Sequence, residues 1–224
     1  MIAARVISLC IGYVCGLFLG GYFIGKIKHK DIREFGSGNV GTTNATRAFG
    51  LKGGLFTLVC DIVKGFVAAG IVCMIFKGKY DGLTVKLLAS YAAFGAMLGH
   101  MFPFYMGFKG GKGVATSLSF LALCVPQTIP LCVLTFIVVV VLTRYVSLGS
   151  ILGVIVVVLQ LFLFGSRGRL FYSGAMLKEV TVLVCVAAVI VIIKHHENIG
   201  RLLRGEENKF GRKRKADKSS HMQS

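Results

Sequence analysis

The sequence predicts an all-α integral membrane protein, a polytopic bundle of about seven transmembrane helices. Of its 224 residues, 55% are hydrophobic and only 16% are charged, and the mean hydropathy is +0.76. The apolar residues lie in long runs, and nearly all the cations lie between or after these runs. A soluble domain of this length rarely has such a composition. We therefore expect membrane lipid around the chain and no nucleic-acid partner, despite a net charge of +17.

The first apolar run, 2–25, is long enough to cross about 30 Å of hydrocarbon as a helix. Gly12, Gly16 and Gly20 recur in it every four residues. This spacing places small residues on one helix face, so a neighbouring helix can approach closely.

Six further apolar runs follow, two of them short. Of these two, 113–125 predicts a short or tilted helix, and Pro126 and Pro130 break helix continuity after it. Seven spans place the two termini on opposite sides of the membrane. The other five runs are 55–76, 85–105, 128–143, 150–165 and 176–193.

The distribution of cations orients the bundle. With the N-terminus outside and the C-terminus inside, the cytoplasmic segments contain 18 Lys and Arg residues and the outer segments contain 7. Cytoplasmic loops are enriched in Lys and Arg, so we expect this orientation, in a bacterial cytoplasmic (plasma) membrane.

The polar segments then collect on the cytoplasmic face, as expected for an active site at a membrane surface. Glycines in these segments let backbone N–H groups converge on an anion, and Arg47, Lys109 and Lys112 add positive charge. The segments are "GSGNVGTTNATRAFG" (36–50), "FKGGKGVAT" (108–116), "RYVSLGS" (144–150) and "KHHENIGRLLRGEE" (194–207).

Two segments resemble nucleotide-binding motifs, but neither meets all the requirements of its motif. "GSGNVG" fits GxGxxG but follows an apolar helix and "KIKHKDIREF" rather than a strand. "GGKGVAT" lacks the GxxxxGK[ST] spacing of a phosphate-binding P-loop. The residues themselves favour a phosphorylated, water-soluble ligand. Three alternatives stay open: loops that only set topology and meet lipid headgroups, a transporter or anion channel, and a structural scaffold.

Three motifs together resemble the bacterial acyl-phosphate:glycerol-3-phosphate acyltransferase family (PlsY). They are "GSGNVGTTNATR", "GHMFPFYMGFKGGKGVAT" and "KHHENIGRLLRGEE", and "DIVKG" (61–65) also fits the family pattern. The resemblance covers nearly the whole chain. It implies transfer of a fatty acyl group from an acyl phosphate to the 1-hydroxyl of sn-glycerol 3-phosphate. The products are then lysophosphatidic acid and phosphate, in the first step of phospholipid synthesis, with no metal or coenzyme A requirement. We expect no cofactor and infer no obligate protein partner.

The resemblance also assigns site residues. Ser37, His195 and Asn198 correspond to catalytic positions, with Asn198 three residues after His195 and so on the same helix face. Thr43, Arg47 and Lys109 correspond to phosphate contacts, and Ser147 to a residue that lines the pocket. The full set expected to bind substrate or phosphate is Gly38, Asn39, Gly41, Thr43, Asn44, Arg47, Lys109, Gly110, Gly111, Lys112, Gly113 and Ser147.

Two positions depart from the family pattern, and two mechanisms stay open. Thr42 stands where alanine is usual, and His196 where arginine is usual. His195 could take the proton of the attacking hydroxyl, since an unperturbed imidazole pKa of about 6.5 suits this role. Alternatively, the phosphate of the donor takes that proton and His195 only orients. Direct transfer is favoured over a covalent acyl-Ser37, because no GxSxG or SxxK pattern is present.

Several other polar and aromatic residues have less specific interpretations. We favour a structural ion pair for Asp61 and Lys64, whereas His100 fits a structural and a pocket role equally well. "FPFYMGF" (102–108) fits an acyl groove and an interfacial aromatic belt equally well. We expect one membrane-embedded domain over 1–211, followed by a basic, disordered cytoplasmic tail over 212–224.

Overall fold

The computed structural model describes residues 1–211, and this part of the chain is an all-α bundle. The prediction of a basic tail over 212–224 lies outside the described residues. The helices are α1 (Ile2–Gly16), α2 (Gly20–Ile27), α3 (Thr42–Phe76), α4 (Gly82–Met101), α5 (Val114–Cys124), α6 (Ile129–Thr143), α7 (Val146–Ser166), α8 (Gly174–Lys194) and α9 (His196–Leu203). Short 3₁₀ turns lie at Ile32–Glu34, Phe104–Met106 and Pro126–Thr128.

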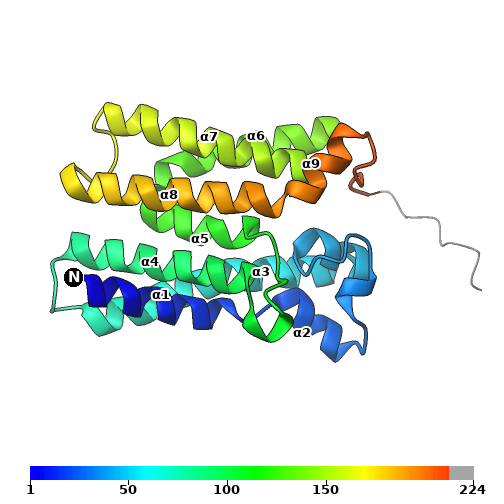
Figure 1. The fold of residues 1–224 in the computed structure, drawn as a ribbon, viewed down its shortest axis with the longest axis horizontal. Coiled ribbons are helices and arrows are strands. Elements are labelled where there is room, and N and C mark those ends of the chain that lie inside the picture. Colours follow the sequence, from blue (N-terminus) through cyan, green and yellow to red (C-terminus); the bar gives the residue numbers. More distant parts are fainter. Residues whose placement is uncertain (212–224) are drawn as a thin grey trace, which may run out of the picture.

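Six helical segments are long and apolar enough to cross a membrane, and α5 is a shorter apolar helix. All seven expected runs are therefore helical, and the expected short helix is α5. The six longer segments are Ile2–Ile27, Thr42–Phe76, Gly82–Met106, Pro126–Thr143, Val146–Ser166 and Gly174–Lys194. The N-terminus lies at one end of the bundle and α9 at the other (Figure 1).

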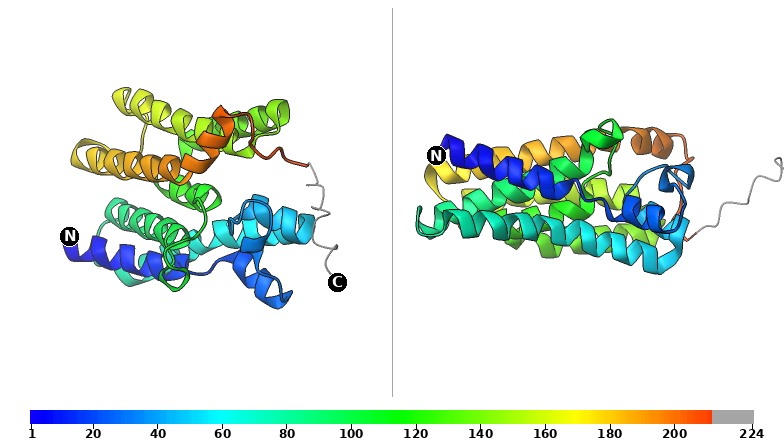
Figure 2. Two further views of the ribbon diagram at one scale, coloured as in Figure 1. Left: turned by 45° about the vertical axis from the view of Figure 1, so that its right-hand side comes forward. Right: turned by 90° about the horizontal axis from the view of Figure 1, so that it is seen from below.

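The helices form two layers with α5 between them (Figures 1 and 2). The first layer contains α1, α3 and α4, and the second contains α6, α7 and α8. Between the layers, α4 contacts α8 directly. The helix α5 contacts α3 and α4 on one side and α6 and α8 on the other. At the end that carries the N-terminus, Glu179 of α8 accepts hydrogen bonds from Arg5 of α1 and, at 2.5 Å, from Tyr91 of α4. This cluster ties the layers together at that end.

The glycine face of the first helix packs as predicted at Gly12 and Gly16, whereas Gly20 belongs to α2 and packs against Thr57 and Cys60 of α3. Gly12 and Gly16 lie against the backbone of α4, where a Cβ on either glycine would overlap Ala92 or Ala96. The close packing of α1 on α4 therefore depends on the absence of side chains at these positions.

Two helices differ from the predicted runs. The first run breaks at residues 17–19 into α1 and α2, and Lys64 of α3 donates to the freed Phe18 carbonyl over 3.1 Å. The helix that contains the second apolar run, α3, begins earlier than predicted, because residues 42–49 of the polar segment are also helical. They join the rest of α3 at a kink, where Gly50 has φ of +76°, a conformation that favours glycine.

Candidate active site

A cavity of about 470 Å³ lies between the two layers and reaches α9. One part of its wall is polar and comes from residues 37–47, 112–113, 147 and 195–208. The rest is apolar and comes mainly from α5 to α8, including Phe120, Val157 and Val191. The cavity therefore has a polar end and an apolar end.

Three helices begin at this cavity. Thr42 of α3, Val114 of α5 and Ser147 of α7 all stand in the first turn of their helix and line the wall. The first N–H groups of a helix have no partner within the helix, and the helix dipole is positive at this end. The convergence of three N-termini makes the polar end suitable for an anion such as a phosphate.

The cavity brings together most of the residues expected in the site and leaves four out. The four residues outside its wall are Gly38, Lys109, Gly110 and Gly111, and Lys109 is exposed to solvent. The residues in the wall are Ser37, Asn39, Gly41, Thr43, Asn44, Arg47, Lys112, Gly113, Ser147, His195 and Asn198.

Two asparagines shape the loop that precedes α3. Buried Asn44 accepts a hydrogen bond from the Ser37 N–H over 3.0 Å and donates to the Ile32 carbonyl over 3.0 Å. Asn39 accepts from the Gly41 N–H over 2.9 Å. The hydroxyl of Thr42 lines the same wall, is buried and has no hydrogen-bond partner among the described residues. Asn44 thus holds Ser37 beside the start of α3.

The glycine loop of residues 108–113 contains two lysines, and Lys112 is the one that lines the cavity. Its ammonium donates to the side-chain oxygen of Asn198. Burial lowers the pKa of Lys112 to about 8, and the nearby positive charge of Arg201 adds to this effect. An anion in the cavity would favour the charged form of this amine, so binding and protonation are coupled.

Glu207 joins several site residues, and the sequence patterns did not single it out. Its carboxylate accepts from Ser147 over 3.0 Å, from Asn198 over 2.7 Å and from Arg201 over 2.8 Å. Burial alone would raise the pKa of Glu207, but these hydrogen bonds outweigh burial and lower it. The Glu207 side chain is only 6% exposed, so it organises α7 and α9 as an ionised carboxylate.

His195 is buried at the junction of α8 and α9. Its Nδ1 donates to the Val191 carbonyl over 2.8 Å, which leaves the Nε2 lone pair as the acceptor of the neutral ring. Burial lowers the pKa of His195 to about 4. The imidazole is therefore neutral at pH 7 and can accept a hydrogen bond from a hydroxyl.

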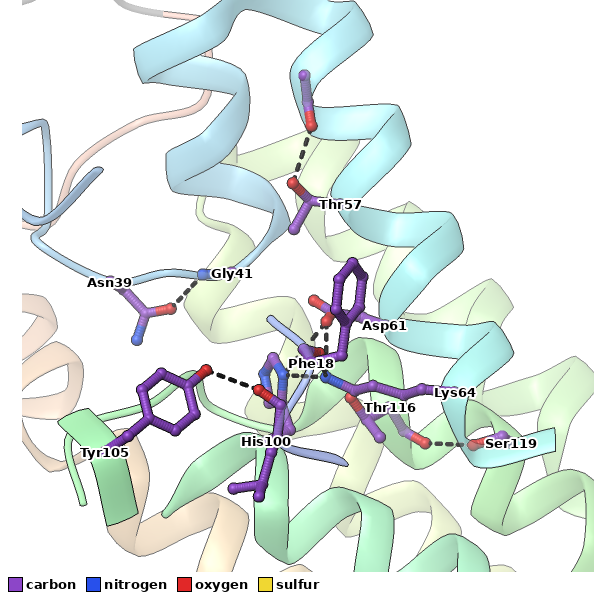
Figure 3. A network of polar contacts seen from close by, with 12 residues as sticks. Phe18, Asn39, Gly41, Thr57, Asp61, Lys64, His100, Tyr105, Thr116 and Ser119 are labelled. Carbon is purple, nitrogen blue, oxygen red and sulfur yellow. Dashed lines mark hydrogen bonds and ion pairs between the residues drawn. The ribbon is translucent and has the colours of Figure 1, made fainter. Parts of the chain in front are cut away.

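Asp61, Lys64 and His100 form a buried polar cluster (Figure 3), and its His100 ring lies against Gly111 of the glycine loop, residues 108–113. Lys64 of α3 contacts Asp61 at 2.9 Å and Nδ1 of His100, from α4, at 2.7 Å. Asp61 and His100 also line the cavity. The expected ion pair between Asp61 and Lys64 is present, and His100 combines a structural contact with a place in the cavity wall. The i, i+3 spacing of Asp61 and Lys64 signals their pairing, whereas no local pattern links them to His100.

Comparisons with known proteins agree with this architecture. A family model described as "Glycerol-3-phosphate acyltransferase" matches residues 6–205. A protein of that name from Bartonella quintana is 37% identical over 212 residues, covering 89% of this chain and 92% of that protein. Crystal structures of PlsY, an integral membrane glycerol 3-phosphate acyltransferase, are 35% identical and cover 92% of this chain. The glycerol 3-phosphate form gives a TM-score of 0.77 with 96% of its own chain covered, and the lysophosphatidic acid form gives 0.74 with 95% covered. The chain belongs to the glycerol-3-phosphate acyltransferase family.

Proposed function

We propose that this membrane acyltransferase takes its acyl group from a fatty acyl phosphate and transfers it to the 1-hydroxyl of sn-glycerol 3-phosphate. The products are lysophosphatidic acid and inorganic phosphate. The observation that carries this proposal is the composition of the cavity. A polar end with Arg47, Lys112 and three helix N-termini suits the phosphates, and a continuous apolar wall suits the acyl chain.

The reaction needs positioning more than chemical activation. In an acyl phosphate the acyl carbon already carries a good leaving group, so catalysis can rest on orientation and charge stabilisation. The glycerol oxygen forms the new ester bond as the bond from the acyl carbon to the phosphate oxygen breaks. Lys112 and Arg47 neutralise phosphate charge, and the Ser37 hydroxyl stabilises the oxyanion of the tetrahedral intermediate.

The geometry of His195 favours an orienting role. Its Nε2 lone pair accepts a hydrogen bond from the attacking hydroxyl, because Nδ1 already donates to Val191. A base works best with a pKa near the operating pH, and the pKa of His195 is about 4. In this mechanism the hydroxyl proton goes to the departing phosphate, and Asn198 fixes substrate and Lys112 together.

We further propose seven crossings, an outer N-terminus and a cytoplasmic active site. The excess of Lys and Arg in the segments at the α9 end of the bundle supports this orientation. Soluble glycerol 3-phosphate then enters from the cytoplasm, and the acyl donor enters from the bilayer.

Two measurements test the proposal. Purified protein is supplied with labelled glycerol 3-phosphate and either palmitoyl phosphate or palmitoyl-CoA, and lysophosphatidic acid is quantified. Product with acyl phosphate alone supports the donor, whereas product only with palmitoyl-CoA refutes it. His195→Gln keeps an acceptor but cannot act as a base at neutral pH. Turnover within about tenfold of wild type supports the orienting role, and complete loss in folded protein supports the base role instead.

A further inference from the structure

We propose that the buried cluster of Asp61, Lys64 and His100 is a positioning device for the glycine loop that carries Lys112. Through this loop the cluster sets the affinity for the phosphate of glycerol 3-phosphate. The inference rests on the proposed role of Lys112 as a phosphate ligand.

Lys64 is held at the centre of the cluster from three sides. Its ammonium contacts Asp61, His100 Nδ1 and the Phe18 carbonyl at 2.9, 2.7 and 3.1 Å. The three side chains of the cluster are at most 5% exposed. An ionised Asp61 and an ionised Lys64 give the cluster no net charge, which suits a membrane interior. Nδ1 of His100 also lies 3.2 Å from Oδ1 of Asp61, so each side chain of the cluster contacts the other two.

The His100 ring is in turn a wall against which the glycine loop packs. His100 is in the last turn of α4, and its carbonyl accepts from the Gly111 N–H over 3.0 Å. A Cβ at Gly111 would overlap three atoms of the His100 ring. Gly111 does not have a left-handed backbone, so the ring is the obstacle to a side chain there. The orientation of the ring therefore fixes the path of the loop immediately before Lys112.

Gly110 is a matched control, because its neighbours are different. A Cβ at Gly110 would overlap the His100 carbonyl and approach Cδ of Pro103 to 2.5 Å. Truncating the His100 side chain removes neither obstacle. We therefore expect His100→Ala to relieve the effect of Gly111→Ala but not the effect of Gly110→Ala.

The test measures KM for glycerol 3-phosphate and kcat in His100→Ala, Gly111→Ala, Gly110→Ala and the two double variants with His100→Ala. We expect Gly111→Ala to raise KM about tenfold or more, the size of one lost charge-assisted contact, with kcat within about threefold of wild type. His100→Ala makes room for the added methyl, so the double variant should have a KM close to that of His100→Ala alone. Gly110→Ala should show no such rescue. Because rescue is a gain relative to the single variant, misfolding cannot imitate it. Independent, multiplicative effects of His100→Ala and Gly111→Ala would overturn the proposal.

A second arm tests Lys64 and separates this inference from the proposed donor. Lys64→Met should raise KM for glycerol 3-phosphate, whereas Lys86→Met should not, because Lys86 stacks 3.7 Å above the Phe171 ring and does not line the cavity. Thermal stabilisation by glycerol 3-phosphate is measured in the same variants without any acyl donor. A wild-type protein that is stabilised but inactive with acyl phosphate contradicts only the proposed donor. Equal stabilisation of wild type and Lys64→Met contradicts the positioning role.

Discussion

Lys112 gives the sharpest prediction, because its buried amine must be charged to hold a phosphate. Its pKa in the free enzyme is about 8. The pKa of Lys112 is lowered, and its charged form binds the phosphate. The affinity for glycerol 3-phosphate therefore falls as the pH rises through 8. For a single group, the charged fraction falls from about 90% at pH 7 to about 10% at pH 9. KM for glycerol 3-phosphate should therefore rise about tenfold over this range.

Lys112→Arg tests the assignment, because a guanidinium stays charged throughout this range. The absolute KM of this variant can differ from wild type, but its profile between pH 7 and 9 should be flat. A phosphate monoester has its second pKa near about 6, so titration of the substrate does not interfere.

The assay is the initial rate of lysophosphatidic acid formation at saturating donor, between pH 6.5 and 9.5. Lys109→Arg is the control, because Lys109 is exposed and outside the cavity wall, and it should retain the wild-type rise. A wild-type KM that stays constant from pH 7 to 9, or a Lys112→Arg variant that keeps the rise, refutes the reasoning.

Three further predictions concern stability and the two lysines. Glu207→Gln should lower the unfolding free energy by about 2 kcal/mol, because it removes the charged acceptor to which Arg201, Asn198 and Ser147 donate. Thermal unfolding in detergent measures this, and an unchanged Tm contradicts it. Lys109→Ala should change KM for glycerol 3-phosphate less than about threefold, whereas Lys112→Ala should raise it at least about tenfold. If the two variants raise KM equally, Lys109 has the phosphate-binding role that the family resemblance gives it. Gly50→Ala should destabilise by about 1 kcal/mol, because a left-handed φ strains alanine; a Tm equal to that of wild type excludes this strain.

Much of the fold was predictable because it depends on short-range patterns. Apolar runs longer than the hydrocarbon thickness have few alternatives to transmembrane helices, and all seven runs are helical. The four-residue glycine spacing predicted a tightly packed face, and Gly12 and Gly16 lie against α4. The helical start of α3 was missed, since the polar residues 42–49 carry no apolar periodicity.

The site was predictable as a set of segments but not as a set of contacts. Glycines, amides and cations on one side of the membrane indicated an anion site. Which of two neighbouring lysines enters it depends on the path of the 109–113 loop, which packs against His100. Glu207 looked like one acidic residue among several in a charged segment, yet from the segment after α9 it bonds to Ser147 of α7.

By itself, the sequence determined an all-α membrane bundle with a basic, glycine-rich face, because hydropathy and local backbone freedom act over a few residues. The tertiary structure alone decided that three helix N-termini meet in one cavity, that Lys112 rather than Lys109 lines it, and that His100 supports the loop between them. These features depend on contacts between helices far apart in the chain, and side-chain packing across the two layers determines their geometry.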